Sequence, residues 1–219
     1  MKFSQKLYKS VEKIWNSYYT HPFVKGIGEG NLDVEKFKFY MIQDYLYLLD
    51  YAKVYALGIV KADDEETMQG FSSMVNDILN GEMSIHRSYM KRLGITNEDI
   101  EKTKPNLSNI SYTHYMLAVA HNGSLAELTV SLLACMWSYQ EIGTNLNKVP
   151  NSIEHEFYGE WIKGYISDEY KKSTKWVIDL IDRLSQDMSK MELEKLKEIF
   201  INTSKYEYMF WDMAFNKGM

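Results

Sequence analysis

Apolar residues recur every three to four positions along almost the whole chain, which is the spacing of amphipathic helices. No run of alternating β-branched residues bounded by turn residues indicates a strand. Only three prolines occur in 219 residues, which suits long helices because proline breaks a helix interior. The pattern therefore predicts an all-α fold, a compact bundle of about seven or eight helices.

Capping residues, glycines and prolines set the bounds of these helices. The predicted helices run, in order, over Phe3 to about Tyr18, Asn31 or Asp33 to about Lys61, "ADDEE" to Gly94, about Ser108 to "HNG", from Ser124 onward, about Ile153 to Gly164, Asp168 to Met188, and Ser189 to the C-terminus. Ser124 with Glu127 and Ser189 with Glu192 have the spacing of capping boxes. Pro22 and the glycines of "GIGEG" predict a loop, and another turn is expected over Thr96 to Asp99. No linker, repeat or low-complexity tract interrupts the series, so residues 1–219 are predicted to form a single domain.

The charge balance excludes several classes of partner. A net charge of −5 and the lack of any Lys/Arg cluster give no attraction for nucleic acid or for a membrane surface. No signal-peptide core and no uncharged apolar stretch of about 18 residues is present. A cytoplasmic location is expected, and the single cysteine, Cys135, fits a reducing compartment because it has no partner for an internal disulfide.

Three ionisable side chains are predicted to lie on apolar helix faces. Asp44 interrupts an apolar stripe of the second predicted helix, and Glu207 interrupts a similar stripe of the last one. On the helix that begins after Ser124, Cys135 lies one turn from Tyr139. Because an unpaired ionised carboxylate is prohibitively unfavourable in an apolar interior, each acid should be hydrogen-bonded or have a raised pKa.

Structural explanations exist for each residue alone. Cys135 could be a small buried hydrophobe, Asp44 could tie two helices together, and Glu207 could face outward if its helix is rotated by one position. Their convergence favours a site, since no basic residue shares these stripes to neutralise the acids. A thiol, proton carriers and the flat walls that seventeen tyrosines can supply suit a small, planar, nitrogen-containing substrate.

A metal site is the main competing interpretation of the acids and histidines. Glu82 and His86 lie one helical turn apart on an apolar stripe. One such pair falls short of a di-iron centre, which needs a second matching set and a spacing of three residues. We therefore expect neither a metal nor another cofactor.

Six segments together resemble the TenA family, the thiaminase II or aminopyrimidine aminohydrolase enzymes. They are "HPFVKGIGEG" (21–30), "QDYLYL" (43–48), "SYTHYM" (111–116), "LLACMWSYQEIG" (132–143), "WIKGY" (161–165) and "YEYMFW" (206–211). The resemblance implies a haem-oxygenase-like bundle without haem, a homotetramer, and a role in thiamin salvage. Family members hydrolyse thiamin, or its degradation product 4-amino-5-aminomethyl-2-methylpyrimidine, to the hydroxymethylpyrimidine.

The resemblance also implies residue roles. Cys135 matches the nucleophile of the cysteine-containing branch, Glu207 matches the proton donor to the leaving group, and Asp44 matches the acid that binds the amidine edge of the pyrimidine. The aromatic residues that match substrate- or sulfur-facing positions are Tyr47 and Tyr112 beside the sulfur, Tyr139 and Tyr165 against the substrate, and Phe210 as a stacking wall. A non-catalytic pyrimidine-binding or regulatory protein and a metal-dependent oxygenase of the same helical superfamily remain as alternatives.

Overall fold

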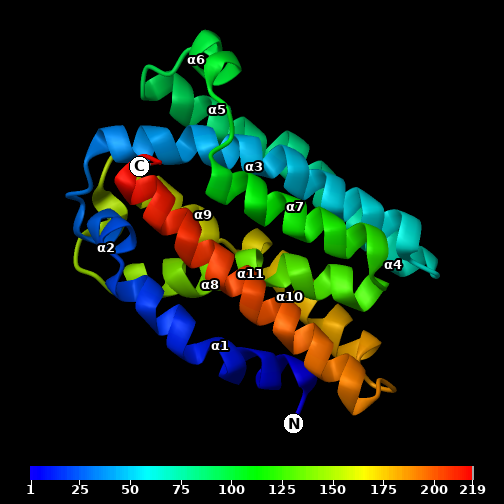
Figure 1. Cartoon of the computed structure of the whole chain (residues 1–219). Helices are drawn as coiled ribbons and strands as arrows, with labels where there is room; N and C mark the ends of the chain where they lie inside the picture. The colour runs from blue at the N-terminus through cyan, green and yellow to red at the C-terminus, as the bar shows by residue number, and fades with distance from the viewer. Residues whose placement is uncertain (219) are drawn as a thin grey trace.

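A computed structural model describes residues 1–218, and these contain helices and no strand (Figure 1). The α-helices are α1 (Phe3–Thr20), α2 (Pro22–Glu29), α3 (Val34–Lys61), α4 (Glu65–Asn76), α5 (Met83–Arg92), α6 (Asn97–Lys102), α7 (Leu107–Asn122), α8 (Leu125–Leu146), α9 (Tyr158–Tyr165), α10 (Asp168–Leu184) and α11 (Lys190–Asn216). A π-helix, η1 (Asp77–Glu82), joins α4 to α5, and a short 3-10 helix, η2 (Ser152–Glu154), precedes α9. The all-α prediction is confirmed.

The capping residues act largely as the sequence indicates. The Asp33 side chain accepts a hydrogen bond from the backbone N–H of Glu35 and begins α3. Ser189 and Glu192 form a reciprocal capping box at the start of α11. Ser124 caps α8 by accepting from the N–H of Glu127. These ends fix where the long helices that carry the site begin.

The sequence prediction was wrong about several shorter elements. The segment Pro22–Glu29 is a helix rather than a loop, because proline is well suited to the first helical position and the glycines do not prevent one short helix. The predicted third helix is divided into α4, η1 and α5, and the expected turn near Thr96 contains α6. The segment before α9 forms only η2, so α9 begins at Tyr158 rather than near Ile153.

Helix α8 lies in the interior and packs against α7, α10 and α11. Figure 1 shows α11 crossing in front of α8, with α1 along one side and α3 with α7 along the other. The buried apolar side chains form one continuous cluster that includes residues from all of these helices. This arrangement brings side chains from α3, α8 and α11 toward a common interior.

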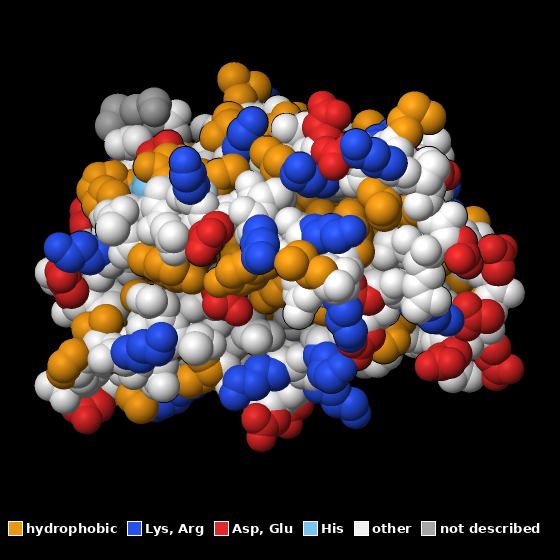
Figure 2. Space-filling model, turned by 90° about the horizontal axis from the view of Figure 1, so that it is seen from below, with side chains coloured by type: hydrophobic (Ala, Val, Ile, Leu, Met, Phe, Trp, Pro, Cys, Tyr) orange, Lys and Arg blue, Asp and Glu red, His pale blue; other side chains and the backbone are white. Residues whose placement is uncertain are grey.

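The outer surface carries mixed charges. Figure 2 shows one face of the molecule, on which basic and acidic side chains alternate with small apolar areas and no continuous basic patch forms. Within residues 1–218, no helix is long and apolar enough to cross a membrane.

One glycine lets α4 approach α3 closely, which gives a stability prediction. A Cβ atom at Gly58 would lie 2.4 Å from the Phe71 ring, which is itself buried and packed edge-on against Trp176. We therefore expect Gly58→Ala to lower the free energy of unfolding by about 1–3 kcal/mol, as overpacking does. Gly164→Ala is the control, because nothing lies within 4 Å of its Cβ position; it should be neutral or stabilising by up to ~1 kcal/mol. Urea denaturation of the two variants measures both effects, and equal stability would contradict the close packing.

Candidate functional site

A cavity of about 620 Å³ opens between α3, η1, α5, α8, α9 and α10. This size is typical of pockets for small organic ligands. Exposed polar residues such as Asp77, Lys163 and Glu169 mark its mouth, whereas Cys135 and Asp44 line its inner wall. The cavity therefore holds two of the three ionisable groups that the sequence singles out.

Cys135 lies on α8 and remains partly accessible from the cavity. Burial raises the pKa of the thiol well above its ordinary value, and the nearby carboxyl of Glu207 raises it further. The nearby Tyr47 hydroxyl, whose hydrogen bond in the resting structure goes to the Met116 sulfur, opposes the rise of this pKa as a potential donor to the thiolate. The resting side chain is therefore a neutral thiol, with one phenol placed to stabilise the thiolate when it forms.

Glu207 lies on α11 and is only 2% exposed, so the alternative in which it faces solvent is wrong. The Tyr112 hydroxyl donates to Glu207 Oε1 at 2.6 Å, and the Cys135 thiol is a second hydrogen-bond partner. Burial raises the pKa of Glu207 to about 8, although the hydrogen bond from Tyr112 opposes the shift. Near neutral pH most molecules therefore hold a proton on Glu207, directly beside the sulfur.

Asp44, 5% exposed, lies on α3 and has a partner that the sequence analysis missed. His86 Nε2 on α5 is 2.7 Å from Asp44 Oδ2, and both side chains are buried. The partner of Asp44 comes from α5 and not from the stripe of Asp44 on α3, so a comparison of residues within one stripe could not find it. A histidine on an apolar stripe was the available signal, but helical periodicity does not reveal which helix lies opposite.

The suspected metal pair has a different arrangement. His86 faces Asp44 through one ring nitrogen and the backbone carbonyl of Glu82 through the other. In residues 1–218, no group of three or more His, Cys, Asp or Glu side chains is arranged to hold a metal ion. The Glu82 side chain lines the cavity, and burial raises its pKa to about 7, while the charge of His86 and a hydrogen bond from Tyr165 oppose that shift.

Aromatic rings form much of the cavity wall. The Tyr139 and Tyr165 rings lie 4.8 Å apart between centroids, and Trp161 packs against both. All three line the cavity together with Tyr47, and so do four further tyrosines: Tyr51, Tyr55, Tyr89 and Tyr170. The sequence analysis assigned neither Trp161 nor these four tyrosines to the site. The tyrosines left out had no motif to distinguish them from ordinary core residues.

Three predicted site residues do not belong to the cavity lining: Glu207, Tyr112 and Phe210. The last two lie behind the aromatic wall. Phe210 packs edge-on against Tyr47 at 5.7 Å, and Tyr112 packs on the same ring at 5.3 Å. Neither belongs to the cavity lining. In this structure Phe210 therefore supports Tyr47, and Tyr112 is placed to act through Glu207.

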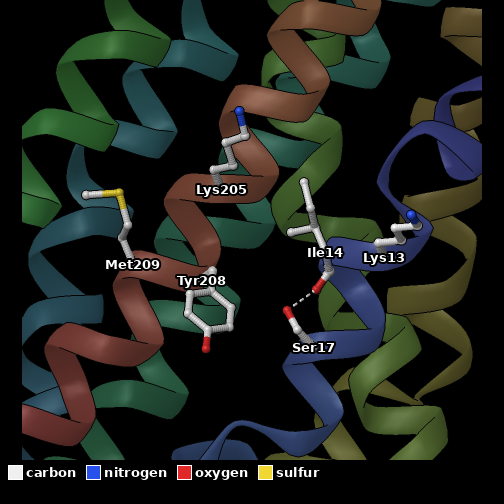
Figure 3. A pocket seen from close by; sticks show the side chains of 6 residues that line it. All are labelled: Lys13, Ile14, Ser17, Lys205, Tyr208 and Met209. Atoms are coloured by element: carbon white, nitrogen blue, oxygen red, sulfur yellow. Dashed lines mark hydrogen bonds between the residues drawn. The ribbon is translucent and has the colours of Figure 1, made fainter.

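A second hollow of about 400 Å³ lies at the surface between α1 and α11 (Figure 3). It is lined by Lys13, Ile14, Ser17, Lys205, Tyr208 and Met209, and Figure 3 shows both lysine side chains extending from their helices. These six residues include no thiol and no carboxylate. The surface hollow thus lacks the thiol and the carboxylates that line the interior cavity.

The geometry can be compared with known proteins. The sequence model of the TENA/THI-4/PQQC family matches residues 8–217. The chain belongs to the TENA/THI-4/PQQC family. Within this family it is 54% identical over 215 residues to the aminopyrimidine aminohydrolase of Helicobacter pylori, a match that covers 98% of this chain and 99% of the relative.

Solved structures agree with the family assignment. A TenA homologue from P. horikoshii OT3 is 33% identical, with a TM-score of 0.91 and complete coverage of both chains. A haem oxygenase from the cyanobacterium Synechocystis sp. PCC6803 shares only 11% identity but reaches a TM-score of 0.65, covering 97% of this chain and 91% of that chain. The second likeness concerns the fold alone, and it confirms the expected haem-oxygenase-like architecture of this TENA/THI-4/PQQC protein.

Proposed function

We propose that this protein is an aminopyrimidine aminohydrolase of thiamin salvage. Its substrates would be 4-amino-5-aminomethyl-2-methylpyrimidine and thiamin, and its product the hydroxymethylpyrimidine. The observation that carries the proposal is the cavity wall on which a thiol, Cys135, and a carboxylate, Asp44, lie between aromatic rings. The activity named for the Helicobacter pylori relative supports it, since the two chains align over almost their full lengths.

In the proposed reaction the Cys135 sulfur bonds to a ring carbon of the pyrimidine. The sulfur loses its proton as this bond forms, and a ring nitrogen gains a proton on the edge that Asp44 binds. The bond between the exocyclic methylene and the amine or thiazolium nitrogen then breaks, and Glu207 protonates an amine leaving group. Water then adds to the methylene, and its spare proton goes to Glu207 when an amine has left and to solvent when the neutral thiazole has left. The carbon–sulfur bond breaks last, and the ring nitrogen returns its proton to the departing sulfur, which restores both the pyrimidine and the Cys135 thiol.

The remaining residues have supporting roles in this proposal. Tyr47 would turn its hydroxyl from Met116 to the Cys135 sulfur and favour the thiolate, while Tyr112 orients the Glu207 carboxyl. Tyr139 and Tyr165 provide flat contacts for the ring. Phe210 would fix Tyr47 in place rather than stack directly on the substrate.

Incubating the purified protein with thiamin and, separately, with the aminomethylpyrimidine tests the function. We expect release of thiazole from the first and of ammonia from the second, with the hydroxymethylpyrimidine formed in both. Binding of the pyrimidine without any release would favour the regulatory alternative. Turnover that requires an added divalent metal and oxygen would favour the oxygenase alternative.

Asp44→Asn should weaken binding of the hydroxymethylpyrimidine roughly 10- to 100-fold, because a charged hydrogen-bond acceptor is worth more than a neutral one. Isothermal titration calorimetry measures the change. Asp50→Asn is the matched control on α3, since Asp50 pairs with Lys53 rather than lining the cavity. Unchanged affinity in Asp44→Asn would give Asp44 a purely structural role.

We also propose that the protein assembles as a homotetramer and works in the cytoplasm. The family resemblance supports the assembly. A single cysteine used as a thiol supports a reducing compartment.

A further inference from the structure

The His86 ring lies between a backbone carbonyl oxygen, which can only accept hydrogen bonds, and an oxygen of Asp44, which accepts as a carboxylate. Nε2 is 2.7 Å from Asp44 Oδ2, and Nδ1 is 3.0 Å from the backbone carbonyl oxygen of Glu82. A neutral imidazole carries one N–H, so one of its nitrogens would direct a lone pair at an oxygen. Beside an Asp44 carboxylate, only the doubly protonated ring donates to both oxygens, and the buried side chain has no other partner for either nitrogen.

A second buried histidine provides a contrast within the same molecule. His21 Nε2 is 3.1 Å from Asp212 Oδ1, but His21 Nδ1 accepts a hydrogen bond from the backbone N–H of Phe23. That nitrogen must be unprotonated, so His21 is a neutral ring. Burial lowers the pKa of His21; for His86, burial acts the same way, but the hydrogen bond and charge of Asp44 outweigh it and raise the pKa.

The charged groups around His86 agree with a cationic ring. Asp44 faces it from α3, and the Glu82 carboxyl lies near it on η1, where Tyr165 of α9 hydrogen-bonds to that carboxyl. No lysine or arginine side chain is paired with Asp44 in residues 1–218. The imidazolium is thus the cation that faces the Asp44 carboxylate in a largely aromatic cavity.

The pair also leaves one oxygen of Asp44 available. His86 occupies Oδ2, and within residues 1–218 the structure gives Oδ1 no hydrogen-bond donor. Oδ1 is not among the polar atoms that are buried without a partner, and Asp44 lines the cavity. A ligand with adjacent N–H groups, such as the amidine edge of an aminopyrimidine, can donate to this oxygen.

We propose that His86 is a positioning residue which, as an imidazolium, pairs with the Asp44 carboxylate and holds its free oxygen toward the amidine edge of the substrate. This inference rests on the proposed function. A carboxylate paired with a cation is a weak base, so a proton on the bound pyrimidine stays on the ring, where it favours addition of the sulfur. His86 would therefore act on binding and on ring activation through Asp44.

The charge of His86 can be measured without any assay of activity. In protein labelled with ¹⁵N-histidine, long-range ¹H–¹⁵N spectra distinguish the imidazolium from either neutral tautomer, and His86→Gln assigns the signal. At pH 7.5 we expect His86 to be doubly protonated and His21 to be neutral. A neutral His86 at that pH would overturn the proposal, even if the wild-type enzyme is active.

A double-mutant cycle tests whether His86 acts through Asp44. Glutamine keeps a donor for Asp44 but cannot be charged, so His86→Gln should weaken binding of the hydroxymethylpyrimidine by about tenfold or more. In an Asp44→Asn background the same change should have an effect of less than about twofold. Equal losses in both backgrounds, or no loss in either, would overturn the proposal.

His21→Gln is the matched control, because it removes a buried histidine paired with an aspartate outside the cavity. We expect unchanged affinity from this variant, and thermal denaturation identifies any variant that fails to fold. If His86→Gln does not fold, backbone-to-side-chain correlation spectra of the wild-type protein assign the His86 signal, and its charge is still decided. If wild-type protein neither binds the pyrimidine nor releases ammonia or thiazole, the proposed function fails, whereas the spectrum tests His86 separately.

Discussion

Cys135→Ser should reduce hydrolysis of both thiamin and the aminomethylpyrimidine by on the order of 10⁴-fold or more, to the limit of detection. A serine hydroxyl is a much weaker nucleophile than a thiol, and nothing at this position could remove its proton efficiently. Burial already keeps the thiol protonated at rest, so the reaction depends on how readily sulfur gives up a proton. Release of ammonia and thiazole measures the loss.

Binding separates a chemical role for Cys135 from a structural one. The hydroxymethylpyrimidine should bind Cys135→Ser with nearly wild-type affinity, because Asp44 and the aromatic wall remain intact. Ser131→Ala is a matched control on α8: it changes a buried small side chain that hydrogen-bonds only to the backbone of its own helix. Its turnover should be unchanged. Wild-type turnover in Cys135→Ser would end the assignment of Cys135 as the nucleophile.

Glu207→Gln should lower kcat with the aminomethylpyrimidine by about 10²–10⁴-fold, the usual contribution of a general acid. Because the pKa of Glu207 is raised to about 8, its carboxyl is mostly protonated at pH 7 and loses its proton as the pH rises through 8. The kcat of the wild-type enzyme should therefore fall above about pH 8. The variant has no proton to lose at this position, so its residual rate should lack that decline.

Folding should be little affected by this substitution. Glutamine has the shape of a protonated glutamate, and its carbonyl oxygen can still accept the hydrogen bond from Tyr112. Glu198→Gln, on an exposed position of the same helix, should keep wild-type activity. A wild-type rate that instead rises through pH 8 would make Glu207 the base that receives the thiol proton, contrary to the donor role proposed above.

The sequence identified Asp44, Cys135 and Glu207 because each interrupts an apolar helix face, which is a local property. It did not identify His86 as the partner of Asp44, because the two residues lie 42 positions apart and meet only through the packing of α5 on α3. A helical stripe shows what one face contains but not which face lies opposite. Only the structure therefore shows which charged residues on different helices form pairs.

The same limit explains the errors in the fold. Long helices with strong caps, such as α3 and α11, were predicted almost to the residue because their ends depend on local hydrogen bonds. Segments such as Pro22–Glu29 were missed because proline and glycine allow either a loop or a short helix, and burial against the rest of the molecule decides between them. Phe210 was expected to face the substrate, although its place behind Tyr47 depends on how α11 is rotated.

The π-helix between α4 and α5 sets the rotational phase of everything that follows it. Each residue of a regular α-helix turns the chain by about 100°, and a π turn accommodates one residue more than an α turn. If the six residues of Asp77–Glu82 formed a regular α-helix instead, the narrower turn would add about 100° of rotation, which would carry the imidazole of α5 away from Asp44. The π-helical conformation of Asp77–Glu82, as much as the identity of residue 86, therefore determines whether an imidazolium faces Asp44 in the cavity.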